Sequence, residues 1–358
     1  MTYIEIIKQS VIIFPLLALL MTFPYMLYTY RKYGALSFFR TMIIYSFSLY
    51  LLTCYLLVIL PLPDSSTVSG SYMDKINLVP FSFVADFFNE NPFRLSQPST
   101  YLLGLKHSTF LVPAFNVLML VPFGSYLRYF FKCSFKKVVL YTFLLSLFFE
   151  LTQLSGLYFI YNAPYRLFDM DDLIQNTAGG MVGYFVASLF TRIMPTRDLI
   201  DSESFEKGKK VSGIRFILAY AIDIQIIGLI SSFSMLPWLF LLIYLGYFTL
   251  LPKKKGSTLG MKLLKFKMSI PKKDHNLLYV VRSVMMLLYF YGIPYSSLWT
   301  IEIINGNGGT IVESAAAFVC FMVFMIYIIV TIYTIFAYRK FVFDKICNVS
   351  YISEVKSG

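Results

Sequence analysis

The sequence has few of the residues that build metal sites and disulfide frameworks. It contains only two histidines and four cysteines, and the cysteines are scattered without a paired spacing. This argues against a structural zinc site and against a disulfide-stapled fold. No haem, flavin or nucleotide signature is present, so we expect no cofactor and assign no metal ligands.

Charge is scarce as well, which excludes an ordinary soluble domain. Charged residues make up 14% of the chain, against about 25% in soluble domains. Hydrophobic residues reach 58%, against about 45–50%. This composition predicts an integral membrane protein that spans the bilayer several times.

The length of the apolar runs sets the expected number of spans. A spanning helix needs about 20 mostly apolar residues, because the hydrocarbon core is about 30 Å thick and each residue rises about 1.5 Å. The sequence therefore predicts an all-α integral membrane protein with about nine transmembrane helices. The expected spans lie near residues 10–30, 38–61, 109–130, 138–160, 173–193, 213–233, 236–251, 277–299 and 314–337.

The 31 basic residues set the expected orientation, because Lys and Arg close to helix ends are retained on the cytoplasmic side. An outside N-terminus and a cytoplasmic C-terminus leave only Lys8, Lys75, Arg94, Lys106 and Arg166 outside. Anionic lipid at the inner leaflet is then a sufficient partner for the net charge of +12. We expect membrane lipids as partners and no nucleic acid; the oligomeric state stays open.

Polar stretches divide the chain into two helical modules. We expect an N-terminal transmembrane anchor at 1–37, a transmembrane domain at 38–193, a cytoplasmic linker at 194–212, a second transmembrane domain at 213–346 and a tail at 347–358. The first apolar stretch has no basic segment before it, so we expect it to be retained rather than cleaved.

A polar stripe follows the expected fourth span. Thr142, Ser146, Glu150 and Gln153 recur at spacings of 4, 4 and 3, which places them on one helix face. A charge in hydrocarbon costs at least about 2.5–3.5 kcal/mol, so this face must meet protein or water. Glu150 and Asn116 of the preceding antiparallel span both lie roughly 12 Å below the outer edge. We expect these two residues to be close together.

The stretch FDMDDLIQNTAGGMVGY, residues 168–184, adds an acidic cluster at the start of the fifth span. Asp171 and Asp172 suit a capping role at the first turn. Gly179 and Gly183 suit close packing between membrane helices. The functional alternative is a polar cavity open to the outer face, where Glu150 either acts on a ligand or serves only to hold the bundle. Its candidate ligand-binding residues are Asn77, Asn116, Glu150, Gln153, Arg166, Asp169, Asp172 and Asn176.

Four motifs, INLVPF (76–81), NVLMLVPFG (116–124), ELTQ (150–153) and RLFDMDDLIQNTAGGMVGY (166–184), resemble the VanZ-like family in order and spacing. The resemblance covers roughly 38–193. It implies a bacterial, multi-pass cell-membrane protein of the envelope that is associated with tolerance of teicoplanin-like glycopeptide and lipoglycopeptide antibiotics. It assigns no biochemical activity.

The second half resembles an RDD domain. The segments GIRFILAYAID, TLGMKLL and FDKI carry the resemblance over 213–346 and supply Arg215, Asp223 and Asp344. Asp223 lies roughly 12 Å into its helix and needs a cation or donor. Arg282 is the partner that we expect for it.

Three functions fit these observations. The first is an envelope protein that binds a lipid, a lipid-linked wall precursor or a glycopeptide antibiotic in the acidic outer cavity. The second is an enzyme that modifies a lipid headgroup, with Glu150 as acid or base and Asp169 and Asp172 on a divalent cation. The third is an ion-coupled transporter with Asp223 and Glu150 on the pathway.

Overall fold

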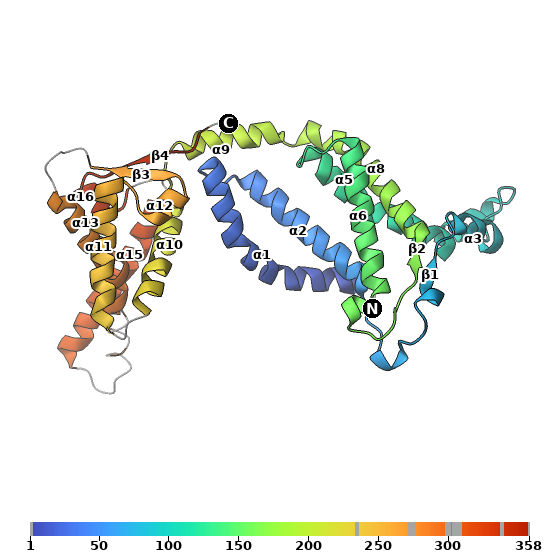
Figure 1. Ribbon diagram of the computed structural model, residues 1–358, viewed down its shortest axis with the longest axis horizontal. Helices are drawn as coiled ribbons and strands as arrows, with labels where there is room; N and C mark the ends of the chain where they lie inside the picture. The colour runs from blue at the N-terminus through green and yellow to red at the C-terminus, as the bar shows by residue number, and fades with distance from the viewer. Residues whose placement is uncertain are drawn as a thin grey trace. The chain divides into compact units, whose positions relative to one another are not determined.

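The computed structural model describes residues 3–232, 236–270, 276–297, 302, 310–336 and 340–356. They fold almost entirely into helices (Figure 1), so the expected all-α membrane fold is confirmed. Within these residues a helix lies at each of the nine expected positions, and seven of them are long and apolar enough to cross a membrane. The other two, α8 (Met170–Ile193) and α11 (Pro237–Lys255), are long but do not meet that composition. The number of spans and the orientation stay predictions.

The apolar surface of the helices identifies their solvent. Very few residues in the most apolar windows of α1 (Tyr3–Tyr33) and α15 (Ile311–Phe336) are buried within the protein. Such large uncovered apolar surfaces are not stable in water, whereas the hydrocarbon of a bilayer accommodates them.

The chain divides into two compact units. The first combines Met1–Met21 with Phe38–Ile200, and the second combines Thr22–Ser37 with Asp201–Gly358. Helix α1 therefore contributes its first part to the first unit and its last part to the second, and α9 (Arg197–Gly208) does the same. The domain boundaries expected from the sequence stay predictions.

The first unit is a helical bundle with a folded loop. Its remaining helices and strands are α2 (Phe38–Ile59), β1 (Ile76–Asn77), α3 (Ser82–Glu90), α4 (Tyr101–Lys106), α5 (Ser108–Tyr129), α6 (Phe135–Leu154), α7 (Gly156–Phe159), β2 (Phe168–Asp169) and α8, with 3-10 turns at Ser65–Thr67, Met73–Lys75 and Pro98–Thr100. Helix α8 packs chiefly against α5 and next against α6.

Glycines allow the contact between α5 and α8. A Cβ at Gly179 would lie 2.0 Å from the carbonyl oxygen of Val117, and one at Gly183 would lie 2.0 Å from that of Val121. No side chain fits at such a distance, so the two helices meet backbone to backbone. The glycines expected to allow close helix packing therefore face α5.

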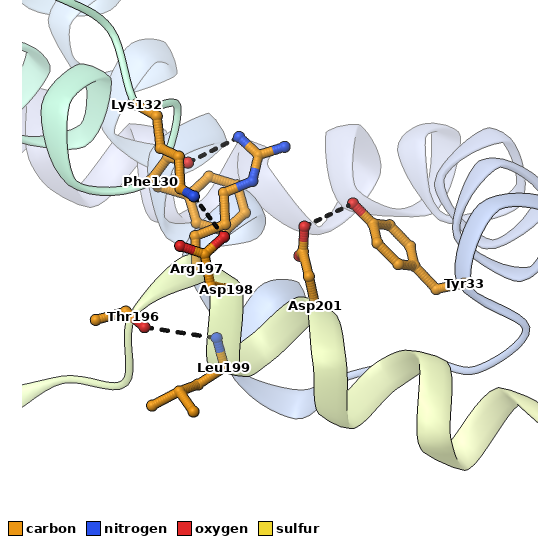
Figure 2. Close-up of polar contacts among 8 residues, drawn as sticks. All are labelled: Tyr33, Phe130, Lys132, Thr196, Arg197, Asp198, Leu199 and Asp201. Carbon is orange, nitrogen blue, oxygen red and sulfur yellow. Dashed lines mark hydrogen bonds and ion pairs between the residues drawn. The ribbon is translucent and has the colours of Figure 1, made fainter. Parts of the chain in front are cut away.

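The start of α9 is tied to the segment that follows α5 (Figure 2). The guanidinium of Arg197 donates a 2.9 Å hydrogen bond to the carbonyl of Phe130, and the ammonium of Lys132 pairs with Asp198 at 2.5 Å. The Lys132–Asp198 pair is largely exposed to solvent. It therefore adds little to stability.

The second unit contains a bundle and a small sheet. Its remaining elements are α10 (Gly213–Ser232), α11, α12 (Leu259–Leu263), β3 (Phe266–Ser269), α13 (Asn276–Leu287) with a π-helical extension (Leu288–Gly292), α15, α16 (Val342–Ile346) and β4 (Ser350–Ser353). Strands β3 and β4 pair antiparallel, with Phe266 opposite Ser353. Aromatic side chains of α10, β3 and α16 fill the core beside this sheet.

The segment before residue 38 belongs to this core. The ring of Tyr33 packs on that of Phe205 at 5.0 Å between centroids, and its hydroxyl donates a 3.4 Å hydrogen bond to Asp201 (Figure 2). The carbonyl of Gly34 accepts a hydrogen bond of 3.4 Å from Arg215. An N-terminal segment thus completes a unit whose other residues lie in the second half of the chain.

Candidate functional site

Two short parallel strands place the acidic cluster. Strand β1 pairs with β2, so that Ile76 lies opposite Phe168 and Asn77 opposite Asp169. The Asn77 side-chain amide donates to both carboxylate oxygens of Asp169, at 3.3 and 3.4 Å. Residues more than ninety positions apart are thereby held together just before α8 begins.

Capping in this region differs from the expected pattern. Asp169 is the N-cap of α8, because its Oδ1 accepts a 2.9 Å hydrogen bond from the backbone N–H of Asp171. Asp171 and Asp172 lie in the first turn of α8, where carboxylates oppose the helix dipole, but the side chain that caps the helix is that of Asp169. The physical reason is that better donors lie elsewhere for both carboxylates.

Asp171 binds the start of α3. Its carboxylate accepts hydrogen bonds from the N–H of Phe81 at 2.5 Å, the hydroxyl of Ser82 at 2.7 Å and the N–H of Phe83 at 2.9 Å. Only 3% of Asp171 is exposed. No sequence pattern predicts this role, because helical spacing describes one helix and says nothing of a partner loop ninety residues away.

Asp172 is bound by Asn116, which joins α5 to α8. The Asn116 amide donates at 2.6 Å to Oδ1 of Asp172 and at 3.0 Å to Oε1 of Gln175. Gln175 lies one turn nearer the middle of α8 and was not among the expected site residues. Its spacing of three from Asp172 is the only sequence signal that points to it.

The polar stripe of α6 meets α8. The hydroxyl of Ser146 accepts a 2.9 Å hydrogen bond from the Asn176 amide, and Oε2 of Glu150 accepts one of 3.0 Å from the N–H of Asp169. Glu150 and Asn176 are each only 3% exposed.

Two further polar residues bind the end of α2. The Gln153 amide donates at 2.9 Å to the carbonyl of Val58. The Arg166 guanidinium donates to the same carbonyl at 3.1 Å and to that of Leu60 at 3.3 Å. Arg166 therefore donates its hydrogen bonds to carbonyl oxygens at the end of α2. Glu150 accepts its hydrogen bond from the backbone where β2 meets α8.

A cavity of about 540 Å³ lies between these helices. Six expected site residues line it: Asn116, Glu150, Gln153, Arg166, Asp172 and Asn176. The wall that they form comes from α5, α6, α8 and the segment before β2. Asn116 and Glu150 thus border the same space. Asn77 and Asp169 are not part of this lining.

A smaller acidic pocket adjoins the cavity. It measures about 320 Å³ and shares Asp172 with it. Its other carboxylates are those of Asp86, Glu90, Asp169 and Asp171. Over the described residues, no group of three or more His, Cys, Asp or Glu side chains is arranged to hold a metal ion.

A known protein family matches part of the first unit. The family model described as VanZ/LLP1 matches residues 47–191, which include α5, α6, α8 and the cavity. This segment is VanZ-like. The chain is accordingly a multi-pass bacterial membrane protein of the cell envelope. No curated protein and no solved structure matches the chain.

Outside the VanZ-like segment, the expected RDD residues are all buried. Arg215 donates to the carbonyls of Leu264, at 3.0 and 2.7 Å, of Lys265 at 2.7 Å and of Gly208 at 3.1 Å. This set of carbonyls holds the chain around the planar guanidinium. The RDD resemblance itself stays a prediction.

The expected pairing of Asp223 with Arg282 is wrong. Asp223 accepts from the hydroxyls of Tyr247 and Thr258, each at 2.5 Å, and from the N–H of Gly260 at 2.6 Å. Arg282 instead pairs with Asp344, with 2.8 Å between Nε and Oδ1. Three donors from α11 and the α12 turn satisfy Asp223, so it needs no cation.

Proposed function

We propose that the protein lowers susceptibility to teicoplanin-like glycopeptide and lipoglycopeptide antibiotics by binding a lipid or a lipid-linked wall precursor in the VanZ-like cavity. The observation that carries the proposal is the cavity of about 540 Å³ in the unit that matches VanZ/LLP1. Its lining combines carboxylate, amide and guanidinium groups with apolar side chains.

The mixed lining supports an amphiphilic ligand. The apolar part includes Ile6, Leu57, Phe115, Met119 and Phe149. An amphiphile places its polar head against the buried polar groups and its chains against the apolar wall. A free sugar or a free ion would leave the apolar wall without a partner.

Antibiotic susceptibility tests the proposal directly. The full chain, Glu150→Gln and Asp172→Asn are expressed in a susceptible bacterium, and teicoplanin tolerance is compared at equal membrane levels. We expect both variants to fall to the tolerance of cells without the protein, because each removes a charge from the cavity lining. Asp64→Asn is the matched control, since Asp64 is an exposed carboxylate outside the cavity.

The opposite result is equally clear. Variants that reach the membrane at normal levels and keep full tolerance would remove Glu150 and Asp172 from the mechanism. A loss of tolerance in Asp64→Asn as well would show that the assay responds to any lost carboxylate.

A further inference from the structure

Among the described residues, several acceptor atoms on side chains that line the cavity have no hydrogen-bond donor, and three of them belong to Glu150, Asp172 and Asn176. Within the described part of the chain, Oδ1 of Asn176 is buried and has no partner. Oε1 of Glu150 accepts no hydrogen bond, since only Oε2 is used by the Asp169 backbone. Oδ2 of Asp172 is likewise unused, since Asn116 donates to Oδ1. All three side chains line the same cavity.

An unpaired buried acceptor is costly, so this arrangement indicates a ligand that supplies donors. Leaving one buried polar group without a partner costs about 1–3 kcal/mol, and more when the group is charged. Only 3% of Asn176 is exposed, and its amide nitrogen already donates a hydrogen bond to Ser146. Oδ1 of Asn176 therefore receives no hydrogen bond from the described residues.

The charge of the lining indicates a cation. Glu150 and Asp172 bring two carboxylates, and Arg166 brings one guanidinium that already donates to Val58 and Leu60. With both carboxylates ionised, the negative charges exceed the positive ones. A cationic donor group would balance this excess and would also satisfy the free acceptors.

We infer that the cavity recognises a membrane lipid through a primary ammonium group, which donates to Glu150, Asp172 and Asn176. A primary ammonium carries three N–H donors, enough for one hydrogen bond to each of these three side chains. The apolar wall takes the lipid chains. The inference rests on the proposed function and specifies the ligand class of the same cavity.

Other cations fit this lining less well. A quaternary ammonium carries no N–H and would leave all three acceptors unpaired. A bare divalent ion is held by several oxygen ligands at about 2.0–2.6 Å, in a space far smaller than about 540 Å³. The apolar part of the lining would have no role for an ion.

Headgroup discrimination by the purified full chain tests the inference. Binding of short-chain phosphatidylethanolamine, phosphatidylcholine and N-acetylated phosphatidylethanolamine is measured in detergent by native mass spectrometry or thermal shift. We expect the primary amine to bind at least about tenfold more tightly than the other two, since charge-assisted hydrogen bonds are lost in both. This comparison uses the unaltered protein, so it does not depend on the folding of a variant.

Variants of the cavity residues then test whether the preference for the primary amine arises in this cavity. Glu150→Gln and Asp172→Asn should reduce the preference for the amine to a few-fold or less, whereas Asp64→Asn should keep it. Equal affinity for amine and quaternary headgroups would overturn the inference. So would phosphoethanolamine without chains binding as tightly as the lipid, or Mg²⁺ or Ca²⁺ alone giving the full thermal shift.

The two proposals fail separately. If tolerance depends on Glu150 while all headgroups bind alike, the ammonium inference falls and the proposed function stands. If the amine preference depends on Glu150 while teicoplanin tolerance does not, the antibiotic role falls and the ligand class stands.

Discussion

Arg282 and Asp344 form an ion pair that is shut off from solvent. The guanidinium Nε lies 2.8 Å from the Asp344 carboxylate, and the two side chains are 1% and 0% exposed. Tyr351 completes the cluster, because its hydroxyl donates to Asp344 at 2.7 Å and accepts from Arg282 at 2.9 Å. One guanidinium nitrogen, NH1, has no partner among the described residues. The pair joins α13 to α16.

Removing one member of this pair should destabilise the second unit strongly. We expect Asp344→Leu to lower the free energy of unfolding by roughly 3–5 kcal/mol, because it leaves a buried, uncompensated charge. Unfolding in SDS monitors the change. The double variant Arg282→Met with Asp344→Leu should recover most of the loss, since no charge then remains buried. Asp198→Asn, at the exposed pair with Lys132, should cost less than about 1 kcal/mol.

Gly179, at the α5–α8 contact, should not tolerate the addition of a single Cβ atom. In Gly179→Ala, the new Cβ would lie 2.0 Å from the carbonyl oxygen of Val117, so the helices must separate. We expect a loss of about 1–3 kcal/mol or more in stability, measured by thermal unfolding in detergent. Gly228→Ala is the control, because a Cβ there meets nothing within 4 Å. Equal behaviour of the two variants would contradict the close packing.

Asp171 should control the order of α3 rather than the stability of α8. Asp171→Ala removes three hydrogen bonds from the α3 start, so amide exchange in Ser82–Glu90 should rise and the loop should be cleaved more readily by protease. The expected cost is about 0.5–2 kcal/mol, as for the loss of other helix caps. Asp74→Asn, an exposed carboxylate of the same loop, should leave both measurements unchanged.

Asn116 should couple α5 to α8. Asn116→Ala takes the donor from Asp172 and from Gln175, and we expect about 1–3 kcal/mol of destabilisation in detergent. Asn162→Ala serves as the comparison, because Asn162 is exposed in the loop before β2. A membrane environment that re-pairs Asp172 would reduce the effect towards about 0.6 kcal/mol, the average for such bonds in bilayers. No difference between the two variants would rule out the coupling.

Much of the architecture is predictable from the sequence, because apolar length and charge placement depend on local residues alone. Helices at the nine expected positions follow from that, as does the shared cavity of Asn116 and Glu150, where depth along two antiparallel helices was enough. The hydrogen-bond partners of a buried side chain are not predictable in this way. Charge predicts Arg282 as the partner of Asp223, yet hydroxyls and a backbone N–H satisfy the Asp223 carboxylate.

The same limit explains the acidic cluster. Asp169, Asp171 and Asp172 lie within four positions of the chain, but each is bound by a different part of it: Asn77, the α3 start and Asn116. Helical periodicity cannot separate such roles, because they depend on which loop returns to the helix. The family resemblance points to Asp169 and Asp172 but not to Asp171, and it gives none of their partners.

The shared use of α1 has a consequence for biosynthesis. Gly34 leaves the ribosome 181 positions before Arg215, the residue that binds its carbonyl. At a synthesis rate of about 5–20 residues per second, the segment Thr22–Ser37 waits roughly 10–40 seconds for its partner. Helices α2 to α8 are all made in that interval. The order of translation therefore favours completion of the VanZ-like bundle first, and the second unit is closed last by a segment that was made near the beginning.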